Sequence, residues 1–405
     1  MSLFENDVED TPHQIPEVNA ELEDGVYFNQ TDEQYHKIER YSASGIKSTL
    51  VSIPTFWAGS WMNPDKEAQD NDTDARILGR AYHAAIFEPE TLASRFVGAP
   101  DLSKYDNLIT SDSAVCAKLK ELGQTQKKAG ETAVMRALRL HDLEPKFNFA
   151  SIIIGEWRET LKGQTEIAPQ YWAQIQQDLQ RIEDNPEIYD LVTGGFSEVT
   201  ILWTCPDSGI RMKARIDKLK ADCFVDLKSF ANALRKPTER TIIEQVMYNG
   251  YYISMRVYQH AIAMIAQLDL KVMDEPGGET KAEIGEVKNE QNNLIDALKA
   301  RTTPLPAWLF FQEKGGIPNL LARRLMLQSY PSGTDPQSIG AEDHQIKTSD
   351  SALCMKADIQ IRHAKKQFNQ AMEIYGPDAV WYSFNMVADM GDSDFNDWFL
   401  NEVPR

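Results

Sequence analysis

Residues 196–230 read FSEVTILWTCPDSGIRMKARIDKLKADCFVDLKSF, and this stretch decides the fold. Polar and apolar residues alternate in three segments of it, and alternation with a period of two is typical of β-strands. The turn residues PDSG and Ala221-Asp222 separate the segments. The stretch therefore predicts an antiparallel meander of three strands, at residues 197–203, 209–220 and 223–230.

The second of these strands has one apolar face and one charged face. Successive strand residues point to opposite sides, so Met212, Ala214 and Ile216 share the apolar face. The other face carries a basic row that ends in a carboxylate: Arg211, Lys213, Arg215 and Asp217. We interpret the three basic residues as contacts for DNA phosphates.

The third strand adds a second carboxylate and a lysine. Asp226 and Lys228 are two residues apart and share a face, and the turn before them brings Asp226 to the end of the strand that holds Asp217. Glu198, at the start of the first strand, adds a third carboxylate. Carboxylates beside a lysine and a basic row suit a hard cation such as Mg²⁺ that faces a phosphodiester.

The short motif Asp226-Leu-Lys228 is weak by itself. Asp269-Leu-Lys271 repeats the same tripeptide without an upstream strand carboxylate or a basic row. The plain alternative for the whole set is a solvated, charged face of a sheet. For His83, in the predicted helix at 74–87, the alternative is a core or capping histidine, and a role in the site requires Gly79 to let this face approach the sheet.

The segments around the meander predict a mixed α/β (α+β) fold. Helices are expected at 42–52, 74–87, 166–192 with a break at Asn185-Pro186, 238–267 and 352–375, and a buried strand at 307–313. Residues 1–24 are interpreted as an acidic disordered tail and residues 25–405 as a single domain. Residues 271–303 are interpreted as a polar surface insertion.

Composition limits the classes of protein. The chain has 405 residues and a net charge of -19. This charge by itself argues against a nucleic-acid partner, but the position of the acidic residues along the chain weakens the argument. Much of the acidity is peripheral, because residues 1–25 hold acids and neither lysine nor arginine. There is no apolar run of about 20 residues for a membrane span, and an acidic start is unlike a signal peptide, so a cytoplasmic protein is expected. The four cysteines have no CxxC spacing and are interpreted as buried thiols.

The chain resembles the PD-(D/E)xK superfamily, and more closely the RecB-like nuclease domain of the exodeoxyribonuclease VIII type found in phages and prophages. The resemblance runs through DGVYFNQTDEQYH, SASGIKSTL, LGRAYHAAIFEPE and LKGQTEI to the meander and PAWLFFQE. It implies a restriction-endonuclease-like core, with a central mixed sheet flanked by helices. Residues 106–160 and 271–303 are insertions that the resemblance does not cover.

The resemblance implies a role for each site residue. His83, Asp217 and Asp226 would bind the metal, Glu198 is the glutamate of the meander, and Lys228 would orient or activate the attacking water. Tyr258 matches the tyrosine of a Gln-xxx-Tyr motif, but Ser254 stands where that motif has glutamine. A serine is too short to replace a glutamine amide, so the contact of Ser254 with the DNA strand is expected to be weaker.

The implied function is a Mg²⁺-dependent exonuclease, in which Mn²⁺ can substitute, acting on the ends of linear double-stranded DNA in phage or prophage recombination. By analogy, the protein would form a ring-like homo-oligomer in the cytoplasm of a bacterial host and work with a single-strand annealing protein. The alternative is a catalytically impaired DNA-binding or assembly subunit, or an acidic decoy. The missing glutamine and the acidity favour this alternative, and the complete carboxylate–lysine set favours the enzyme.

Overall fold

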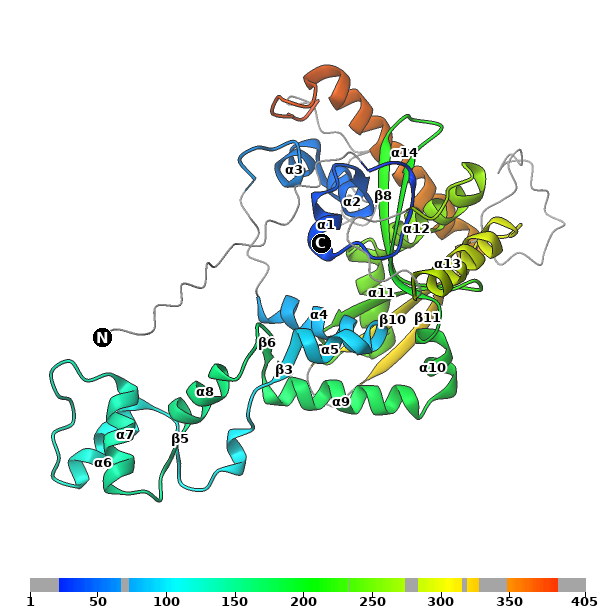
Figure 1. Ribbon diagram of the computed structural model, residues 1–405. Helices are drawn as coiled ribbons and strands as arrows, with labels where there is room; N and C mark the ends of the chain where they lie inside the picture. Colours follow the sequence, from blue (N-terminus) through cyan, green and yellow to red (C-terminus); the bar gives the residue numbers. More distant parts are fainter. Residues whose placement is uncertain are drawn as a thin grey trace, which may run out of the picture.

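The computed structural model describes residues 22–66, 73–232, 234–273, 283–314, 319–327 and 348–384 of the chain. Most of the predicted acidic tail, residues 1–21, lies outside these ranges. Within them the chain forms a mixed sheet with helices on both faces, which confirms the predicted mixed α/β fold class (Figure 1).

The sheet is built around the predicted meander. Its hydrogen-bonded order is β1-β7-β8-β9-β10-β11, and a short strand β2 pairs with β8. The β9–β10 and β2–β8 pairs are parallel, and the other neighbours are antiparallel. The strands are β1 (Gly25–Tyr27), β2 (Tyr41–Ser42), β7 (Phe196–Thr204), β8 (Arg211–Leu219), β9 (Phe224–Phe230), β10 (Ala307–Glu313) and β11 (Leu320–Leu325).

Two hydrophobic cores lie on the two faces of this sheet. Alternate residues divide between them: Phe224 and Phe311 join the larger core, whereas Val225 and Phe310 join the smaller one. The larger core is covered by α2 (Ala43–Val51), α3 (Ile53–Gly59), α12 (Tyr251–Gln267), α13 (Glu283–Lys299) and α14 (Thr348–Tyr375). The smaller core is covered by α4 (Asp74–Phe87), α5 (Pro89–Arg95), α9 (Pro169–Glu183) and α10 (Pro186–Val192).

The alternation in the meander slips at one level. Ile216 and Leu219 of β8 are three residues apart, yet both lie in the larger core, and Val199 and Phe196 of β7 do the same. The ladder between β7 and β8 pairs Ser197 with Lys218 and Val199 with Ile216, and no pairing is formed at the level between them. That level holds Glu198 and Asp217, so two of the predicted site residues sit where regular strand geometry is interrupted.

The predicted helix at 238–267 is wrong in one respect, because the structure divides it. α11 (Thr238–Tyr248) ends at Asn249, and α12 begins after Gly250. Gly250 has a left-handed φ of 61°, which a glycine adopts without the steric cost of a Cβ. Apolar residues at helical spacing continue on both sides of the turn, which is why the pattern concealed it.

The segment at 271–303 contributes to the core. Leu294, Ile295 and Leu298 of α13 are buried in the larger core beside α12. These apolar positions follow helical spacing within an otherwise polar sequence. The interpretation of 271–303 as a surface insertion is therefore wrong for this part of α13. Residues 274–282, which belong to the same predicted insertion, lie outside the described ranges.

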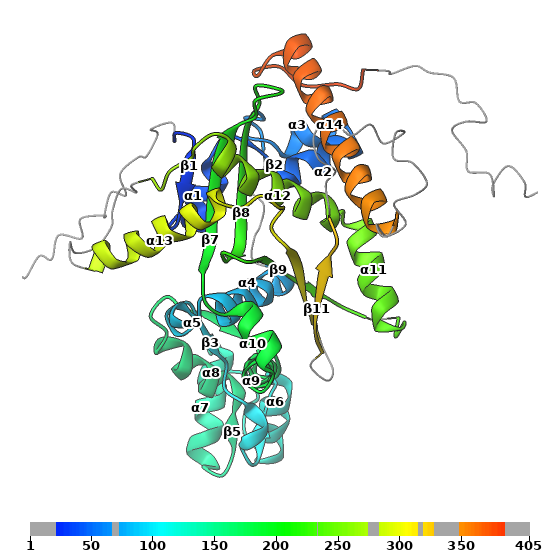
Figure 2. The same cartoon turned by 90° about the vertical axis from the view of Figure 1, so that its right-hand side faces the viewer.

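Residues 101–162 form a lobe that projects from the body of the molecule (Figures 1 and 2). Val115, Leu119, Ala137, Leu140 and Phe149 make a small core of its own. The lobe leaves after β3 (Phe96–Gly98) and returns at β6 (Thr165–Ile167), which pair in parallel. It contains α6 (Asp112–Glu121), α7 (Ala133–Leu143) and α8 (Ala150–Glu159), with β4 (Leu108–Ile109) and β5 (Asn148–Phe149).

Two further features bear on the class of protein. The four cysteines, Cys116, Cys205, Cys223 and Cys354, are buried and not disulfide-bonded, as predicted. None of the helices in the described ranges combines the length and the apolar character that crossing a bilayer requires.

Candidate active site

The predicted carboxylates meet where β8 and β9 separate. The ladder between these strands includes Leu219–Phe224 and Lys218–Val225 and then ends, and Asp217 and Asp226 are the next residues on each strand. An Oδ2 atom of Asp217 accepts the backbone N–H of Leu227 at 2.8 Å, so a side chain takes a donor that a continued ladder would have used. The open level between the strands gives both carboxylates access to a common space.

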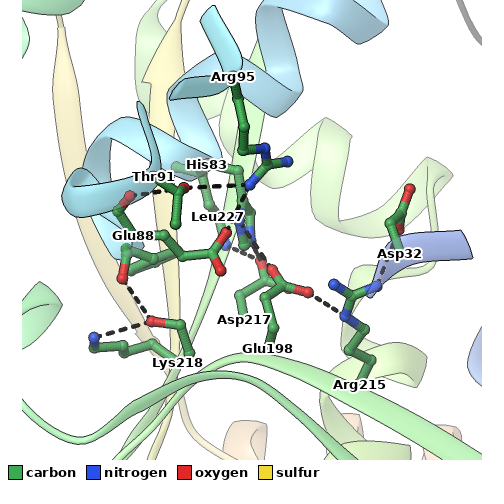
Figure 3. A network of polar contacts seen from close by, with 12 residues as sticks. Asp32, His83, Glu88, Thr91, Arg95, Glu198, Arg215, Asp217, Lys218 and Leu227 are labelled. Atoms are coloured by element: carbon green, nitrogen blue, oxygen red, sulfur yellow. Dashed lines mark hydrogen bonds and ion pairs between the residues drawn. The ribbon is translucent and has the colours of Figure 1, made fainter. Parts of the chain in front are cut away.

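His83 reaches this space from α4. Its Nδ1 lies 2.9 Å from Oε1 of Glu198, and its Nε2 lies 3.3 Å from Oδ2 of Asp217. Figure 3 shows the imidazole directed at both carboxylates, with Arg215 on the far side of Glu198. The requirement placed on Gly79 is wrong, because a Cβ there would meet no atom within 4 Å. Gly79 instead lines the cleft above the site.

Glu198 holds its position with an unusual backbone. Its φ is +55°, in the left-handed region that a residue with a Cβ occupies at a cost of order 1–3 kcal/mol. This conformation coincides with the slip in strand alternation and directs the carboxylate between His83 and Arg215. Such strain persists only where the surroundings fix it, and it is concentrated at functional sites.

The donor set fits a divalent cation. One ligand atom each from His83, Glu198 and Asp217 can be chosen so that all lie within 4.8 Å of one another. Asp226 is only 1% exposed, and its Oδ1 has no hydrogen-bond partner among the described residues. A buried carboxylate oxygen without a donor is costly unless something else satisfies it. Carboxylate ligands suit Mg²⁺ or Mn²⁺, and imidazole is a common ligand of transition-metal cations.

The metal set differs from the expected one in its emphasis. His83, Asp217 and Asp226 were predicted as ligands, whereas the structure brings Glu198 closest to His83 and Asp217. Asp226 forms its ion pair with Lys228 on the same strand. Both residues lie between Phe224 and Phe230, whose side chains enter the larger core, so strand alternation directs them toward α12.

The charges at the site are balanced by close opposite charges. Burial by itself lowers the pKa of His83, but Asp217 and Glu198 outweigh it and raise this pKa to about 10. Burial raises the pKa of Asp217, and His83 and Lys228 overcome this and hold it at about 2. For Asp226, burial prevails over the attraction of Lys228 and raises the pKa to about 6. His83 and Lys228 thus lie beside carboxylates that would also attract a metal cation.

The helix α12 contributes one face to the site. Burial raises the pKa of Tyr258, and the charges of Asp226 and Asp217 add to this effect, which places its hydroxyl near the carboxylates. The ring of Tyr251 lies 5.4 Å from the ammonium nitrogen of Lys228. Ser254 is one helical turn from each of these tyrosines and is buried on the same face. Met247 has helical spacing to Ser254 in the sequence, but it belongs to α11, before the turn at Gly250, and is exposed.

A cleft of about 810 Å³ opens above the candidate metal ligands. His83, Glu198 and Asp217 lie in its lining, together with residues 28–33, Tyr35 and His36 of the N-terminal segment. Its lining also carries three arginines that suit a phosphodiester backbone, Arg80, Arg95 and Arg215. Glu88, another carboxylate of the lining, pairs with Arg95 at 3.1 Å.

The three residues of the basic row have three different environments. Arg215 pairs with Glu198 and, at 3.0 Å, with Asp32 of α1 (Asp32–Lys37). Lys213 is buried, and its ammonium donates to the backbone oxygens of Tyr35 and Ile38 at 2.9 and 2.7 Å. Arg211 begins β8, roughly 20 Å along the strand from Asp217. Of these three residues of the basic row, Arg215 alone lines the cleft.

Sequence reasoning missed α1 and its contact with the site. Asp32 belongs to the stretch TDEQYH, and the contact with Arg215 joins residues 183 positions apart. No local pattern marks such a pair. Among the aromatic residues, Trp57, Trp61 and Tyr252 pack in or against the larger core, and Tyr251 faces Lys228.

The fold and this site define a protein of the PD-(D/E)xK class. The chain belongs to the family of the PDDEXK-like domain of unknown function (DUF3799), whose model matches residues 58–272. This confirms the predicted superfamily, and the matched range includes His83, Glu198, Asp217, Asp226, Lys228 and Tyr258. Membership supports a nuclease-type function with a divalent metal and DNA as the substrate class.

A crystal structure described as "Putative exonuclease" from Eubacterium rectale is similar to the chain. The sequence identity is 14% and the TM-score is 0.39, with 84% of this chain and 87% of that chain covered. A likeness of this size carries no argument about activity. No curated protein matches the sequence of the chain.

Proposed function

We propose that the protein is a Mg²⁺-dependent exonuclease that hydrolyses phosphodiester bonds from the ends of linear double-stranded DNA. The observation that carries this proposal is the convergence of His83, Glu198 and Asp217 with the Asp226–Lys228 pair below a cleft of about 810 Å³. Carboxylate and imidazole ligands can fix a cation that activates water and polarises a phosphate, and the arginines of the cleft suit the charge of a DNA backbone.

The chain's own residues would perform distinct tasks. His83, Glu198, Asp217 and Asp226 would hold the cation, which when bound would polarise the scissile phosphate and lower the pKa of a water. Burial by itself lowers the pKa of Lys228, but the charges of Asp226 and Asp217 raise it above its usual value, so Lys228 would orient that water as an ammonium donor. Arg215 would stay close to the phosphate and hold Glu198 in place. Tyr258 would close the site from the α12 side.

The competing proposal is a non-catalytic DNA-binding or assembly subunit on the same fold. Ser254 in place of a glutamine favours it, because the serine hydroxyl offers less reach to the strand. The complete and convergent ligand set favours the enzyme. A ring-like homo-oligomer, an annealing partner and a role in phage recombination stay predictions from the resemblance.

The test is nucleotide release from linear DNA. The purified full chain should release acid-soluble nucleotides from linear duplex DNA with Mg²⁺ or Mn²⁺ and none with a chelator. It should leave a covalently closed circle intact, because a closed circle has no end. Asp226→Asn should abolish release, and Asp269→Asn should not, since Asp269 is exposed and pairs with Lys299, away from the candidate ligands.

Two outcomes would contradict the proposal. DNA binding without release in any divalent cation would favour the non-catalytic alternative. Cleavage of closed circles at a rate equal to that of linear DNA would establish an endonuclease.

A further inference from the structure

A second lysine stands beside the candidate active site on a different element from Lys228. Lys47 lies on α2 and is partly buried where α2 packs against α12. Its ammonium nitrogen is 5.8 Å from the centre of the Tyr251 ring, and Lys228 approaches the same ring at 5.4 Å. Two cations from distant parts of the chain therefore converge on one aromatic side chain.

The two lysines differ in what balances their charge. Lys228 pairs with Asp226, just as His83 and Arg215 each face a carboxylate. Lys47 has no carboxylate within ion-pair distance among the described residues, and its hydrogen bond goes to the backbone oxygen of Asn249 at 3.2 Å. An ammonium has three donors, so most of the capacity of Lys47 is left for a ligand.

The surroundings of Lys47 favour an anion. Burial lowers the pKa of Lys47, and the nearby charge of Lys228 lowers it further, while Asp226 opposes the effect. The ammonium of Lys47 is thus close enough to Lys228 for mutual repulsion. An anion between the two lysines would relieve this repulsion, and the phosphate of a DNA strand is an anion that the site already has reason to admit.

The turn between α11 and α12 is shaped around this lysine. A Cβ added at Gly250 would lie 3.1 Å from Cδ of Lys47 and 3.6 Å from Cγ, tighter than most such contacts at the first of these atoms. The φ of 61° at Gly250 also disfavours any residue with a Cβ. The glycine therefore gives the stem of Lys47 a path along the turn to the ring of Tyr251.

We propose that Lys47, together with Tyr251, binds a phosphate group of the DNA strand next to the phosphodiester that is cleaved. This rests on the proposed function, since it assigns a DNA-binding residue to the same site. The phosphate is either an internal phosphodiester or a terminal phosphate monoester, because an ammonium binds both. A purely structural role, in which Lys47 only caps the backbone oxygen of Asn249, is the alternative to be excluded.

The test measures DNA affinity without cleavage. Binding of the full chain to short duplexes, with and without a 5′-phosphate, is measured by fluorescence anisotropy in Ca²⁺ over a range of salt concentrations. Lys47→Gln should weaken binding about tenfold and reduce the salt dependence by about one phosphate contact. Lys47→Arg should restore both. The matched control is Lys356→Gln. Lys356 is an exposed lysine of α14, and its ammonium nitrogen lies 5.9 Å from the ring of Tyr252, the residue next to Tyr251 on α12.

Each outcome decides a separate point. A loss confined to 5′-phosphorylated duplexes identifies the terminal phosphate as the ligand, and an equal loss on both duplexes identifies an internal phosphate. Binding by Lys47→Gln equal to wild type, or an equal loss in Lys356→Gln, overturns the inference. If Lys47→Gln fails to fold, Lys47→Met keeps the apolar stem and serves in its place. If Lys47→Gln loses DNA affinity as expected but the wild-type protein cleaves no DNA, the proposed enzyme is rejected and the phosphate-binding site is kept.

Discussion

The same tripeptide, Asp-Leu-Lys, occurs twice in this chain, and the copy at Asp226 is the one that lies in the candidate site. Asp226 is 1% exposed, follows a buried strand residue and lies beside Asp217. The side chain of Asp269 is 75% exposed, follows the end of α12 and pairs with Lys299. A short motif gains a function from its neighbours, and at Asp226 those neighbours come from two strands and two helices.

At the residue scale, Glu198 should be needed for metal affinity. Glu198→Gln keeps the shape and the backbone conformation but removes a charged ligand, so the affinity for Mn²⁺ should fall by about tenfold or more. Isothermal titration calorimetry on the full chain measures this affinity directly.

The matched control for this substitution is Glu88→Gln. Glu88 lies in the wall of the same cleft and pairs with Arg95, but it is not one of the three converging ligands. Its Mn²⁺ affinity should stay at the wild-type level. Loss of affinity in Glu88→Gln with none in Glu198→Gln would place the cation elsewhere in the cleft.

At the element scale, α12 links the site to the rest of the body. Tyr251, Ser254 and Tyr258 lie on the face toward the site, and Arg256 and His260 point to α14. Arg256 forms a bidentate salt bridge with Asp358, in which Nε donates to Oδ1 at 2.8 Å and Nη2 donates to Oδ2 at 2.9 Å. His260 approaches the same carboxylate at 3.2 Å. This pair fixes the rotation of the helix that carries the tyrosines.

Asp358→Asn should therefore destabilise the protein at pH 7. The Arg256 side chain is only 7% exposed and would be left without its counter-charge, which costs roughly 2–3 kcal/mol after allowance for the partial exposure of Asp358. Denaturant unfolding measures the free energy. Glu121→Gln is the comparison, since its pair with Lys118 is exposed and should change stability by less than about 0.5 kcal/mol. Equal effects of both substitutions would refute this role for Asp358.

The sequence predicted those elements whose pattern is local. The meander was predicted because Met212, Ala214 and Ile216 alternate with charged residues. The helix expected at 42–52 corresponds to α2, whose N-cap residue Ser42 accepts the N–H of Gly45. The turn at Gly250 was missed because the apolar spacing continues through it. The slip at Glu198 and Asp217 has no periodic signal, and the contact of Asp32 with Arg215 depends on how distant segments pack.

At the scale of the whole molecule, the body and the lobe use separate cores. No residue of the two large cores, as far as the structure describes the chain, comes from residues 101–162, and the lobe core takes none from the sheet. The candidate site lies entirely in the body. Figures 1 and 2 show the lobe at the end of the molecule opposite α14. The lobe is therefore expected to fold and unfold as its own unit.

Removing the lobe should leave the body and its metal site intact. β3 and β6 pair in parallel, so a linker that replaces residues 101–162 must run back along the pair, and a flexible Gly/Ser linker of about a dozen residues or more can make this crossover. The shortened chain should keep the main thermal transition within about 5 °C of the wild type and should keep the wild-type affinity for Mn²⁺.

Leu119→Ala in the full chain is the complementary change, because it removes a fully buried side chain from the lobe core and should destabilise the lobe by ~2–4 kcal/mol. Calorimetry should then resolve an early transition for the lobe, followed by an unchanged transition for the body. A single transition that shifts as a whole, or loss of Mn²⁺ binding in the shortened chain, would mean that the lobe and the body form one cooperative unit.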